Sequence, residues 1–347
     1  GIDIRDGFNL ALKHMNGKLG NLPAEVIVAD DQQNPEVAKQ TAERLLKRDK
    51  VDFMTGTVFS NVMLAVGTPA FQNKTFFISP NAGPSQYAGA QCNPYFFNVS
   101  QQNDALHEAA GKTMHDKGFK RVALIAPNYP AGKDSIAGFK RFYKGEIGME
   151  TYTALNQLDY GAELSKMRAA GVDGVYIFLP GGLGVNFIKQ FVGAGLAKDM
   201  TLYAPGFSAD EDVIRAVGDS MLGTFHTAHD IDNAGNKKFV TDFQKEYGRM
   251  PSLYASHGYD AARLMDSAVR EVKGKLDDKA ALRKALEAAK FESVRGGFKF
   301  NSNHFPVQDY YLRVVTKDAQ GRLTNRTVGT VFKNHADAYA SECKMPG

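Results

Sequence analysis

Cysteine is scarce in this chain of 347 residues, which contains only Cys92 and Cys343. Two thiolates cannot supply the four ligands of an all-cysteine metal site, so that class of centre is excluded. The two residues are either buried free thiols or the halves of a disulfide. A disulfide would fit an oxidising compartment and would tie the C-terminal tail to the first half of the chain.

Long apolar runs are also missing, since no stretch approaches the roughly 18 residues that a membrane-spanning helix needs. We therefore expect no membrane insertion. The sequence has no recognisable signal peptide, and it starts at Gly1 rather than at an initiator methionine. We expect that a leading segment has been removed.

The chain has little excess of either charge, because 42 lysines and arginines face 38 aspartates and glutamates, for a formal net charge of +4. Its hydrophobic fraction of 43% argues against disorder. The basic residues are scattered, which argues against a nucleic-acid partner. The length is sufficient for about two domains of ordinary size.

The motifs of common enzymes are incomplete. His107 begins a pattern that lacks the second histidine of a zinc-protease helix, and we interpret it as a surface histidine. Gly181, Gly182 and Gly184 follow a predicted strand, but the third glycine of a dinucleotide-binding loop is absent. Ser60 has no neighbouring base to activate it, and neither a Gly-x-Ser-x-Gly elbow nor a phosphate-loop lysine motif occurs. We predict a protein that is not an enzyme and needs no cofactor or metal.

What the sequence does contain is a regular alternation of short apolar runs with segments of helical spacing. The runs predict strands at residues 25–29, 51–56, 75–79, 121–126, 149–154, 174–179 and 201–204. Such alternation is typical of parallel sheets covered by helices on both faces. Because the pattern starts afresh near residue 100, we predict two α/β lobes of one architecture. The first run opens with a helix at residues 2–15 and is one strand short of the second.

Two strand-to-helix junctions in the first lobe have the composition of a ligand site. One leads from residues 51–56 to a helix beginning near Ser60, and the other leads from residues 75–79 into a loop of small polar residues. The first amides of a helix have no internal partner and lie at the positive end of its dipole, so the junction at Ser60 suits an anion. The carboxyl ends of neighbouring parallel strands face one crevice, where ligands bind in open sheets.

Residues 56–61 (GTVFSN), 78–85 (ISPNAGPS) and 251–262 (PSLYASHGYDAA) give the chain a family resemblance. It resembles the periplasmic solute-binding proteins of ABC importers, in the type I group typified by leucine/isoleucine/valine-binding proteins. The likeness covers nearly the whole chain in order. It implies two Rossmann-like lobes with parallel central sheets, joined by a hinge of three crossovers. It also implies that the first strand of the family and its pocket loop precede Gly1.

The predicted lobes are discontinuous along the chain. Lobe 1 comprises residues 1–100 and 231–309, and lobe 2 comprises residues 101–230 and 310–347. The C-terminal tail can return to lobe 1 through Cys343. Several crossing segments favour a hinge over a floppy tether.

The resemblance also assigns binding residues in lobe 1. The carboxylate-binding hydroxyl of the family falls on Ser60, with Phe59 beside it. The neighbouring loop contributes Asn81, Ala82 and Gly83 through backbone groups.

In lobe 2 the sequence departs from the amino-acid binders of the family. Those proteins hold the substrate ammonium with an acidic residue after the strand at residues 201–204, but here that position is Gly206, followed by Phe207. A buried ammonium without a partner is costly, which disfavours an amino acid. Pro180 and Ala131 stand where tyrosines are usual in the family.

These departures remove polar groups and make room for an apolar ring. We predict an aromatic slot beside Gly181, although each of its rings could instead belong to a core: Phe59, Tyr129, Phe178, Phe207 and Tyr254. Residues 79–85 and 88–92 resemble the subgroup that takes up aromatic acids such as benzoates, phenylpropanoids or aryl keto acids. The resemblance thus implies a monomeric periplasmic receptor whose lobes close on an aromatic carboxylate and deliver it to the permease subunits of an ABC importer.

Two rival interpretations remain open at this level. The same fold could bind a branched-chain amino acid, an amide or urea. A ligand-sensing domain of a signalling protein is the rival from another class, because fold does not fix function.

Overall fold

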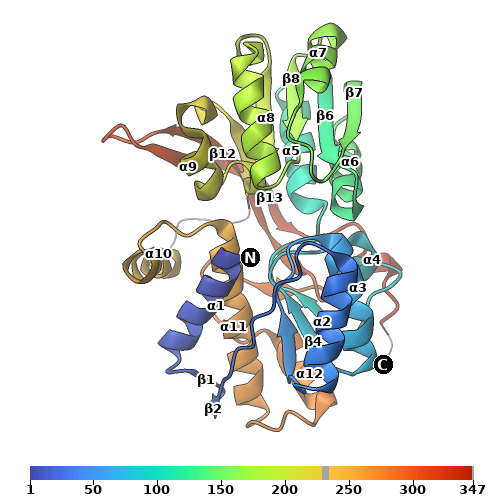
Figure 1. Ribbon diagram of the computed structural model, residues 1–347, viewed down its shortest axis with the longest axis vertical. Helices are drawn as coiled ribbons and strands as arrows, with labels where there is room; N and C mark the ends of the chain where they lie inside the picture. Colours follow the sequence, from blue (N-terminus) through green and yellow to red (C-terminus); the bar gives the residue numbers. More distant parts are fainter. Residues whose placement is uncertain (229–233, 346–347) are drawn as a thin grey trace. The chain divides into compact units, whose positions relative to one another are not determined.

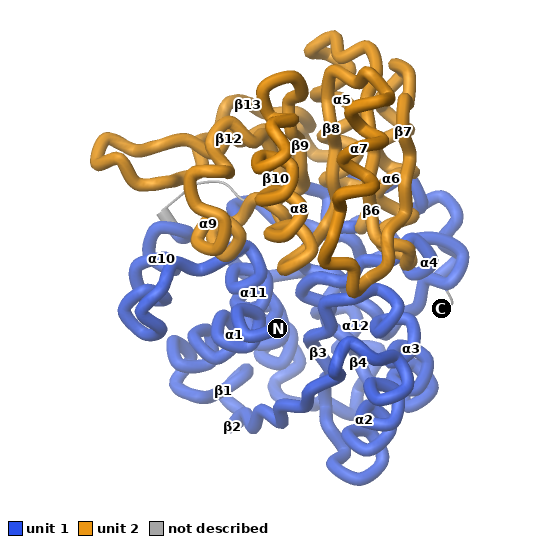
Figure 2. The backbone as a smooth tube through the Cα atoms, turned by 45° about the horizontal axis from the view of Figure 1, so that its top comes forward, with its two compact units in different colours: residues 1–102, 231–308, 336–347 blue, residues 103–230, 309–335 orange. Residues whose placement is uncertain are grey.

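The computed structural model describes residues 1–228 and 234–345 and divides the chain into two compact units. Unit 1 comprises Gly1–Gln102, Ile231–Gln308 and Ala336–Gly347, and unit 2 comprises Asn103–Asp230 and Asp309–His335 (Figure 2). The tail from Ala336 belongs to unit 1, which is the return through Cys343 that we left open and not the main assignment of residues 310–347 to lobe 2. This return adds a fourth passage to the three that we predicted. The predicted boundary at residues 230–231 lies outside the described residues.

Unit 1 contains a three-stranded parallel sheet in the order β3-β4-β5. The central strand, β4, is labelled in Figure 1. Alternate side chains of the strands of this sheet enter different clusters, because successive residues of a strand point to opposite faces. Phe76 and Ile78 pack in one cluster, whereas Phe77 packs in the other. Its elements are α1 (Ile2–His14), β1 (Lys18–Leu19), β2 (Leu22–Pro23), α2 (Pro35–Lys47), β3 (Phe53–Thr55), α3 (Ser60–Gln72), β4 (Phe76–Ser79), α4 (Ser85–Ala88), β5 (Phe96–Asn98), α10 (Ala234–Tyr247), α11 (Leu253–Glu271), α12 (Lys279–Ala288), β11 (Lys299–Phe300) and η4 (Ala340–Glu342).

The strand that we predicted at residues 25–29 is wrong, because this segment is not part of any strand. Val26, Ile27 and Val28 are 42%, 39% and 65% exposed. A strand exists through hydrogen bonds to a neighbour, and β4 is the only described strand that pairs with β3. Residues 25–29 therefore have the apolar, β-branched composition of a strand but no neighbouring strand to pair with among the described residues.

Unit 2 contains a larger sheet in which β7, β6, β8, β9 and β10 run parallel, followed by antiparallel β12, which in turn pairs with β13. The predicted α/β class with parallel sheets is confirmed. The elements are α5 (Ala105–Asp116), β6 (Arg121–Pro127), α6 (Pro130–Phe142), β7 (Glu146–Thr153), α7 (Gly161–Ala170), β8 (Gly174–Ile177), α8 (Gly182–Gly193), η1 (Leu196–Lys198), β9 (Thr201–Pro205), η2 (Gly206–Ser208), α9 (Glu211–Val217), η3 (Gly218–Met221), β10 (Phe225–Ala228), β12 (Pro306–Lys317, which begins in unit 1) and β13 (Leu323–His335).

Helices α5 and α6 of unit 2 approach each other closely through glycine. A Cβ atom on Gly111 would lie 2.2 Å from the carbonyl oxygen of Phe139, and one on Gly138 would lie 2.8 Å from that of Asp104. Neither distance is compatible with a side chain. The two helices therefore hold one fixed separation.

Buried neutral histidines make the stability of unit 2 depend on pH. His226 on β10 is 1% exposed and donates from Nε2 to Oδ1 of Asn325 at 2.7 Å. Burial, and after it the charge of Arg313, lower the pKa of His226 to about 3. Between that value and the ordinary pKa of about 6.5 only the unfolded chain binds the proton, so stability falls as the pH falls.

We expect this histidine to cost about 1.4 kcal/mol of unfolding free energy per pH unit below about pH 6. Denaturant titrations at several pH values between 7 and 4 would measure the slope in the wild type and in His226→Gln. The variant should show a shallower slope by that amount. Equal slopes in the two proteins would contradict the assignment.

The two cysteines form a disulfide, with the Cα atoms of Cys92 and Cys343 5.5 Å apart across 251 residues of sequence. The disulfide alternative is thereby confirmed over free thiols. Both residues belong to unit 1, so the bond fixes the tail to the unit that contains β4 and β5.

Replacing both cysteines with alanine is expected to lower the unfolding free energy by about 2–4 kcal/mol, because the unfolded chain loses a cross-link. Urea titration of the double variant would test this. Reduction of the wild type should reproduce the effect, and a double variant as stable as the oxidised wild type would contradict it.

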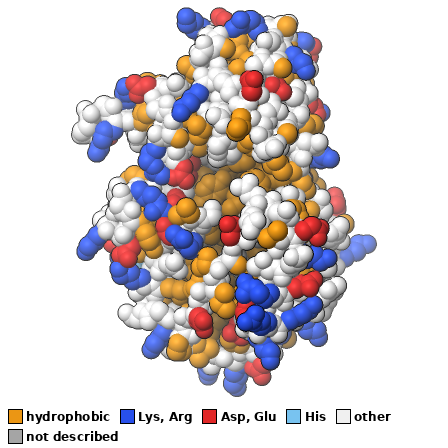
Figure 3. Space-filling view, viewed as in Figure 1, with side chains coloured by type: hydrophobic (Ala, Val, Ile, Leu, Met, Phe, Trp, Pro, Cys, Tyr) orange, Lys and Arg blue, Asp and Glu red, His pale blue; other side chains and the backbone are white. Residues whose placement is uncertain are grey.

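No helix in the part of the chain that the structure describes is long and apolar enough to cross a membrane. Lysine and arginine side chains are interspersed with aspartate and glutamate on the face drawn in Figure 3. The basic residues, which are scattered along the sequence, thus form no single basic patch on this face.

Candidate functional site

The first candidate half-site is the start of α3 in unit 1. Gly56 and Thr57 have φ values of +105° and +60°, which turn the chain sharply after β3, and extended Phe59 then precedes the first helical residue, Ser60. Ser60 is 1% exposed, and the first turn of α3 contains no acidic side chain. The positive end of this 13-residue helix is therefore not neutralised by its own sequence, so it can accept an external anion.

The loop after β4 lies against the segment that leads to Ser60. Asn81, which is 8% exposed, donates from Nδ2 to the carbonyl oxygen of Val58 at 2.7 Å. Sequence reasoning placed Ser60 and Asn81 at neighbouring strand ends, and this hydrogen bond joins the two loops. The Oδ1 atom of Asn81 is buried without a partner among the described residues, so it is available to a hydroxyl or amide donor.

Hydrogen bonds from inside unit 1 fix the conformation of the same loop. The carbonyl oxygen of Ala82 accepts from Ser79 Oγ at 2.7 Å and from Asn98 Nδ2 at 3.1 Å. A Cβ atom on Gly83 would lie 2.3 Å from the carbonyl oxygen of Gln101, so only glycine fits there. The loop is therefore a rigid element rather than an adaptable one.

The remaining predicted residue of unit 1, Tyr254, lies half-buried in the first turn of α11. Phe59 is also half-buried and packs against a core cluster of the unit. We left open that each predicted ring belongs to a hydrophobic core, and this is the case for much of the Phe59 ring.

The second candidate half-site is a group of aromatic rings in unit 2. The ring of Phe178 stacks on Tyr129 with centroids 6.3 Å apart and meets Phe207 edge-on at 6.2 Å. The three residues are only 4–7% exposed. They follow β6, β8 and β9, so three loops at the carboxyl ends of parallel strands bring together three of the five rings that the sequence predicted.

Backbone geometry positions these loops. Ser208 donates from Oγ to the carbonyl oxygen of Leu179 at 2.8 Å, which ties the loop after β9 to the loop after β8. Gly206 begins the short helix η2, and Gly181 has a φ of +58° just before α8. Between Leu179 and Gly181 stands half-buried Pro180.

The turn from β6 into α6 sets the position of Tyr129. A Cβ atom on Gly132 would lie 1.7 Å from the carbonyl oxygen of Pro127, so the turn cannot accept a larger residue. Ala131 is buried within the first turn of α6. Burial, and after it the charge of Asp134, raise the pKa of Tyr129 far above its usual range, so its hydroxyl stays protonated.

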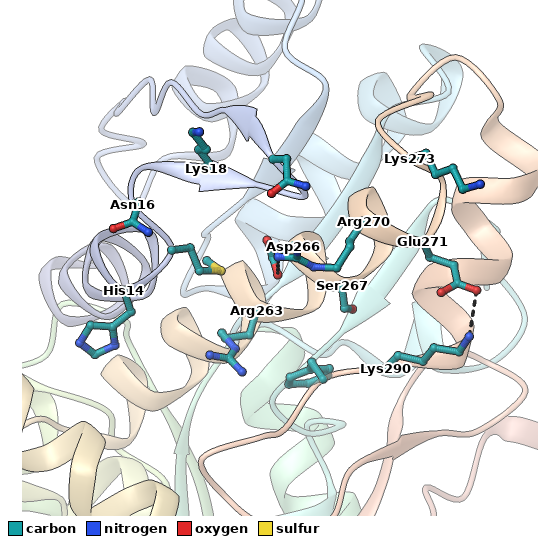
Figure 4. A pocket seen from close by; sticks show the side chains of 13 residues that line it. His14, Asn16, Lys18, Arg263, Asp266, Ser267, Arg270, Glu271, Lys273 and Lys290 are labelled. Atoms are coloured by element: carbon teal, nitrogen blue, oxygen red, sulfur yellow. Dashed lines mark hydrogen bonds and ion pairs between the residues drawn. The ribbon is translucent and has the colours of Figure 1, made fainter.

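A cavity of about 970 Å³ opens elsewhere in unit 1, beside α1 and α11 (Figure 4). It contains none of the residues that the sequence predicted. Its acidic residues are paired within it, Asp266 with Arg270 at 3.0 Å and Glu271 with Lys290 at 2.8 Å. Among the described residues, no group of three or more His, Cys, Asp or Glu side chains could hold a metal ion.

Comparison with known proteins identifies the family of the chain. The model of the periplasmic binding protein family matches residues 1–320. The chain belongs to this family. A Leu/Ile/Val-binding protein homolog from Brucella melitensis is 28% identical to it, with 96% of this chain and 88% of the relative covered.

Two solved structures of ABC-transporter solute-binding proteins are similar to this periplasmic binding protein over nearly its whole length. One, from R. palustris and solved in complex with benzoate, is 32% identical, has a TM-score of 0.93 and covers 99% of this chain and 95% of its own. Another, from Rhodopseudomonas palustris BisB5 with 3,4-dihydroxybenzoic acid, is 30% identical with a TM-score of 0.90 and coverages of 97% and 94%.

Sequence reasoning misjudged one residue of this family member. His107 is 1% exposed, so our interpretation of it as a surface histidine is wrong. Its ring meets that of Phe178 edge-on at 4.9 Å. The helical segment around it has buried residues on every side, Leu106 and Glu108 included, which its mixed composition did not reveal.

Proposed function

We propose that this chain is the periplasmic receptor of an ABC importer and that it binds an aromatic carboxylate of the benzoate type. The observation that carries the proposal is the group of Tyr129, Phe178 and Phe207 at three neighbouring strand ends of unit 2. Flat rings prefer offset-stacked or edge-to-face neighbours, and this group offers such neighbours to a ligand ring. The benzoate complex of a protein that is 32% identical supports the same ligand class.

The carboxylate of the ligand is assigned to unit 1. The amides at the start of α3 and the hydroxyl of Ser60 supply donors, and the fixed loop at Asn81, Ala82 and Gly83 supplies the neighbouring backbone. Charge-assisted hydrogen bonds of this kind are about twice as strong as neutral ones.

A zwitterionic amino acid fits the described residues less well. Gly206 and Phe207 occupy the position where we expect amino-acid binders to carry an acidic residue, and a buried ammonium there would lack its counter-charge. We therefore favour the aromatic acid over leucine, and we assign the chain a transport role without catalysis. The partners that follow from this role are the permease subunits of the importer.

A thermal-shift panel would test the ligand class. Benzoate, 4-hydroxybenzoate and 3,4-dihydroxybenzoate would be compared with leucine, isoleucine and urea at matched concentrations. A ligand present at 100 times its Kd adds about 2.7 kcal/mol of stability, which is readily measured. We expect aromatic acids to stabilise the protein. Stabilisation by leucine and not by any aromatic acid would contradict the proposal.

A further inference from the structure

Phe178 in unit 2 belongs to a buried cluster of aromatic rings that also contains His107, Tyr176 and Phe139. Tyr176 and Phe178 are two residues apart on β8 and its extension, so their side chains share one face of the sheet. His107 of α5 contacts both: its Nδ1 shares a hydrogen bond with the hydroxyl of Tyr176, and its ring meets that of Phe178 edge-on at 66° with centroids 4.9 Å apart. Phe139 of α6 stacks on Tyr176 with the ring centroids 4.7 Å apart.

The position of His107 is fixed from several directions. The close α5–α6 contact at Gly111 and Gly138 sets the distance of its helix from Phe139. The hydroxyl of Thr227 on β10 donates to the carbonyl oxygen of Leu106, the residue before His107, at 2.6 Å. Burial lowers the pKa of His107 to about 3, so its imidazole is neutral at physiological pH. A neutral ring held in this way acts through shape and not through charge.

We infer that His107 is the positioning residue of the ligand-binding ring Phe178, and that Tyr176 in turn fixes His107. Tyr129 and Phe207 flank Phe178 on other sides, and the edge-on imidazole blocks its rotation towards α5. Phe178 is thereby presented to the ligand in one orientation. The chain therefore selects planar over puckered six-membered-ring acids. This inference rests on the proposed function, because it concerns the ring of the same ligand.

Two probes of nearly equal size separate this role from general stability. Benzoate is flat and cyclohexanecarboxylate is puckered, and both carry the same carboxylate. Calorimetric titration gives the two Kd values, and their ratio measures the preference for a flat ring. A general loss of packing would lower the affinity for both acids by the same factor, so the ratio of the two Kd values would not change.

We expect His107→Leu to reduce the preference for benzoate roughly three- to tenfold, because this is the change in binding constant that the free energy of one aromatic contact produces. His107→Phe keeps a ring beside Phe178 and should retain the preference within about twofold. The matched control is His115→Leu, which makes the same change at an exposed position of the same helix. It should leave the ratio at its wild-type value.

A folded His107→Leu variant with the wild-type ratio would overturn the inference. If this variant does not fold, Tyr176→Phe removes only the hydroxyl that fixes His107, and a ratio lowered at least twofold supports the inference while an unchanged ratio overturns it. A wild-type protein that binds neither acid overturns the proposed function and this inference with it. Wild-type binding combined with unaltered variants overturns the inference alone.

Discussion

Ser60→Asp is expected to lower the affinity for benzoate by roughly 100-fold or more while leaving the ligand-free protein folded. The new carboxylate would occupy the positive end of α3, where the proposed ligand places its own. Two like charges about 4 Å apart repel by about 4 kcal/mol at an effective dielectric constant of 20. Because Ser60 is 1% exposed, burial of the new carboxylate costs several kcal/mol, of which the helix dipole offsets about 1–2 kcal/mol, so we expect the unfolding free energy to fall while the variant stays folded.

Calorimetry with benzoate and urea titration of the ligand-free protein would measure the two effects. Ser60→Asn is the matched control, because it has the size of aspartate without its charge, and its loss of affinity should be much smaller. Ser60→Ala removes one hydrogen bond to a charged group, which corresponds to a loss of roughly 10- to 100-fold. If Ser60→Asp binds benzoate as the wild type does, the carboxylate does not lie at α3.

Asp260→Ala is expected to lower the unfolding free energy by about 3–5 kcal/mol, because it strips a buried arginine of its counter-charge. Asp260 and Arg295 are 0% and 6% exposed, and the Asp260 Oδ2 atom accepts from Arg295 Nε at 3.1 Å. Asp260 also accepts from Ser293 Oγ and from the amide of Val294. Burial raises the pKa of Asp260, and the Arg295 charge opposes that rise.

This ion pair also organises two of the segments that leave unit 1. Arg295 donates to the carbonyl oxygens of Val99 and Ser100, just before the passage at residue 102, and to Oε1 of Gln308, the last residue before the third passage. Loss of the pair should therefore disturb both segments. Hydrogen exchange should show faster exchange near residues 99–100 and 308 in the variant.

Urea titration would give the change in stability, and Glu271→Ala provides the comparison. Glu271 pairs with Lys290 on the surface, where the two side chains are 50% and 62% exposed, and such pairs contribute about 0–1 kcal/mol. A loss for Asp260→Ala no larger than that for Glu271→Ala would show that Arg295 finds another partner.

The sequence by itself determined the α/β class, the two-part organisation and the strand ends at which the site is proposed. These features depend on local spacing: short apolar runs, helical periodicity, and junctions such as Gly56 to Ser60. The aromatic character of the second half-site was also readable, since Phe178 lies near the end of the apolar run at residues 174–179 and Phe207 follows the run at residues 201–204 after two residues. The family resemblance added the roles of residues that spacing alone does not assign.

Only the tertiary structure decided which segments find partners far along the chain. Residues 25–29 have the composition of a strand but lie outside any strand, whereas the half-exposed polar segment of β13 becomes a strand by pairing with β12. The tail belongs to unit 1 through Cys343, and His107 is buried by contacts with β8. The physical reason is the same in each case: propensity acts between near neighbours, but pairing and burial depend on residues that only the folded chain brings together.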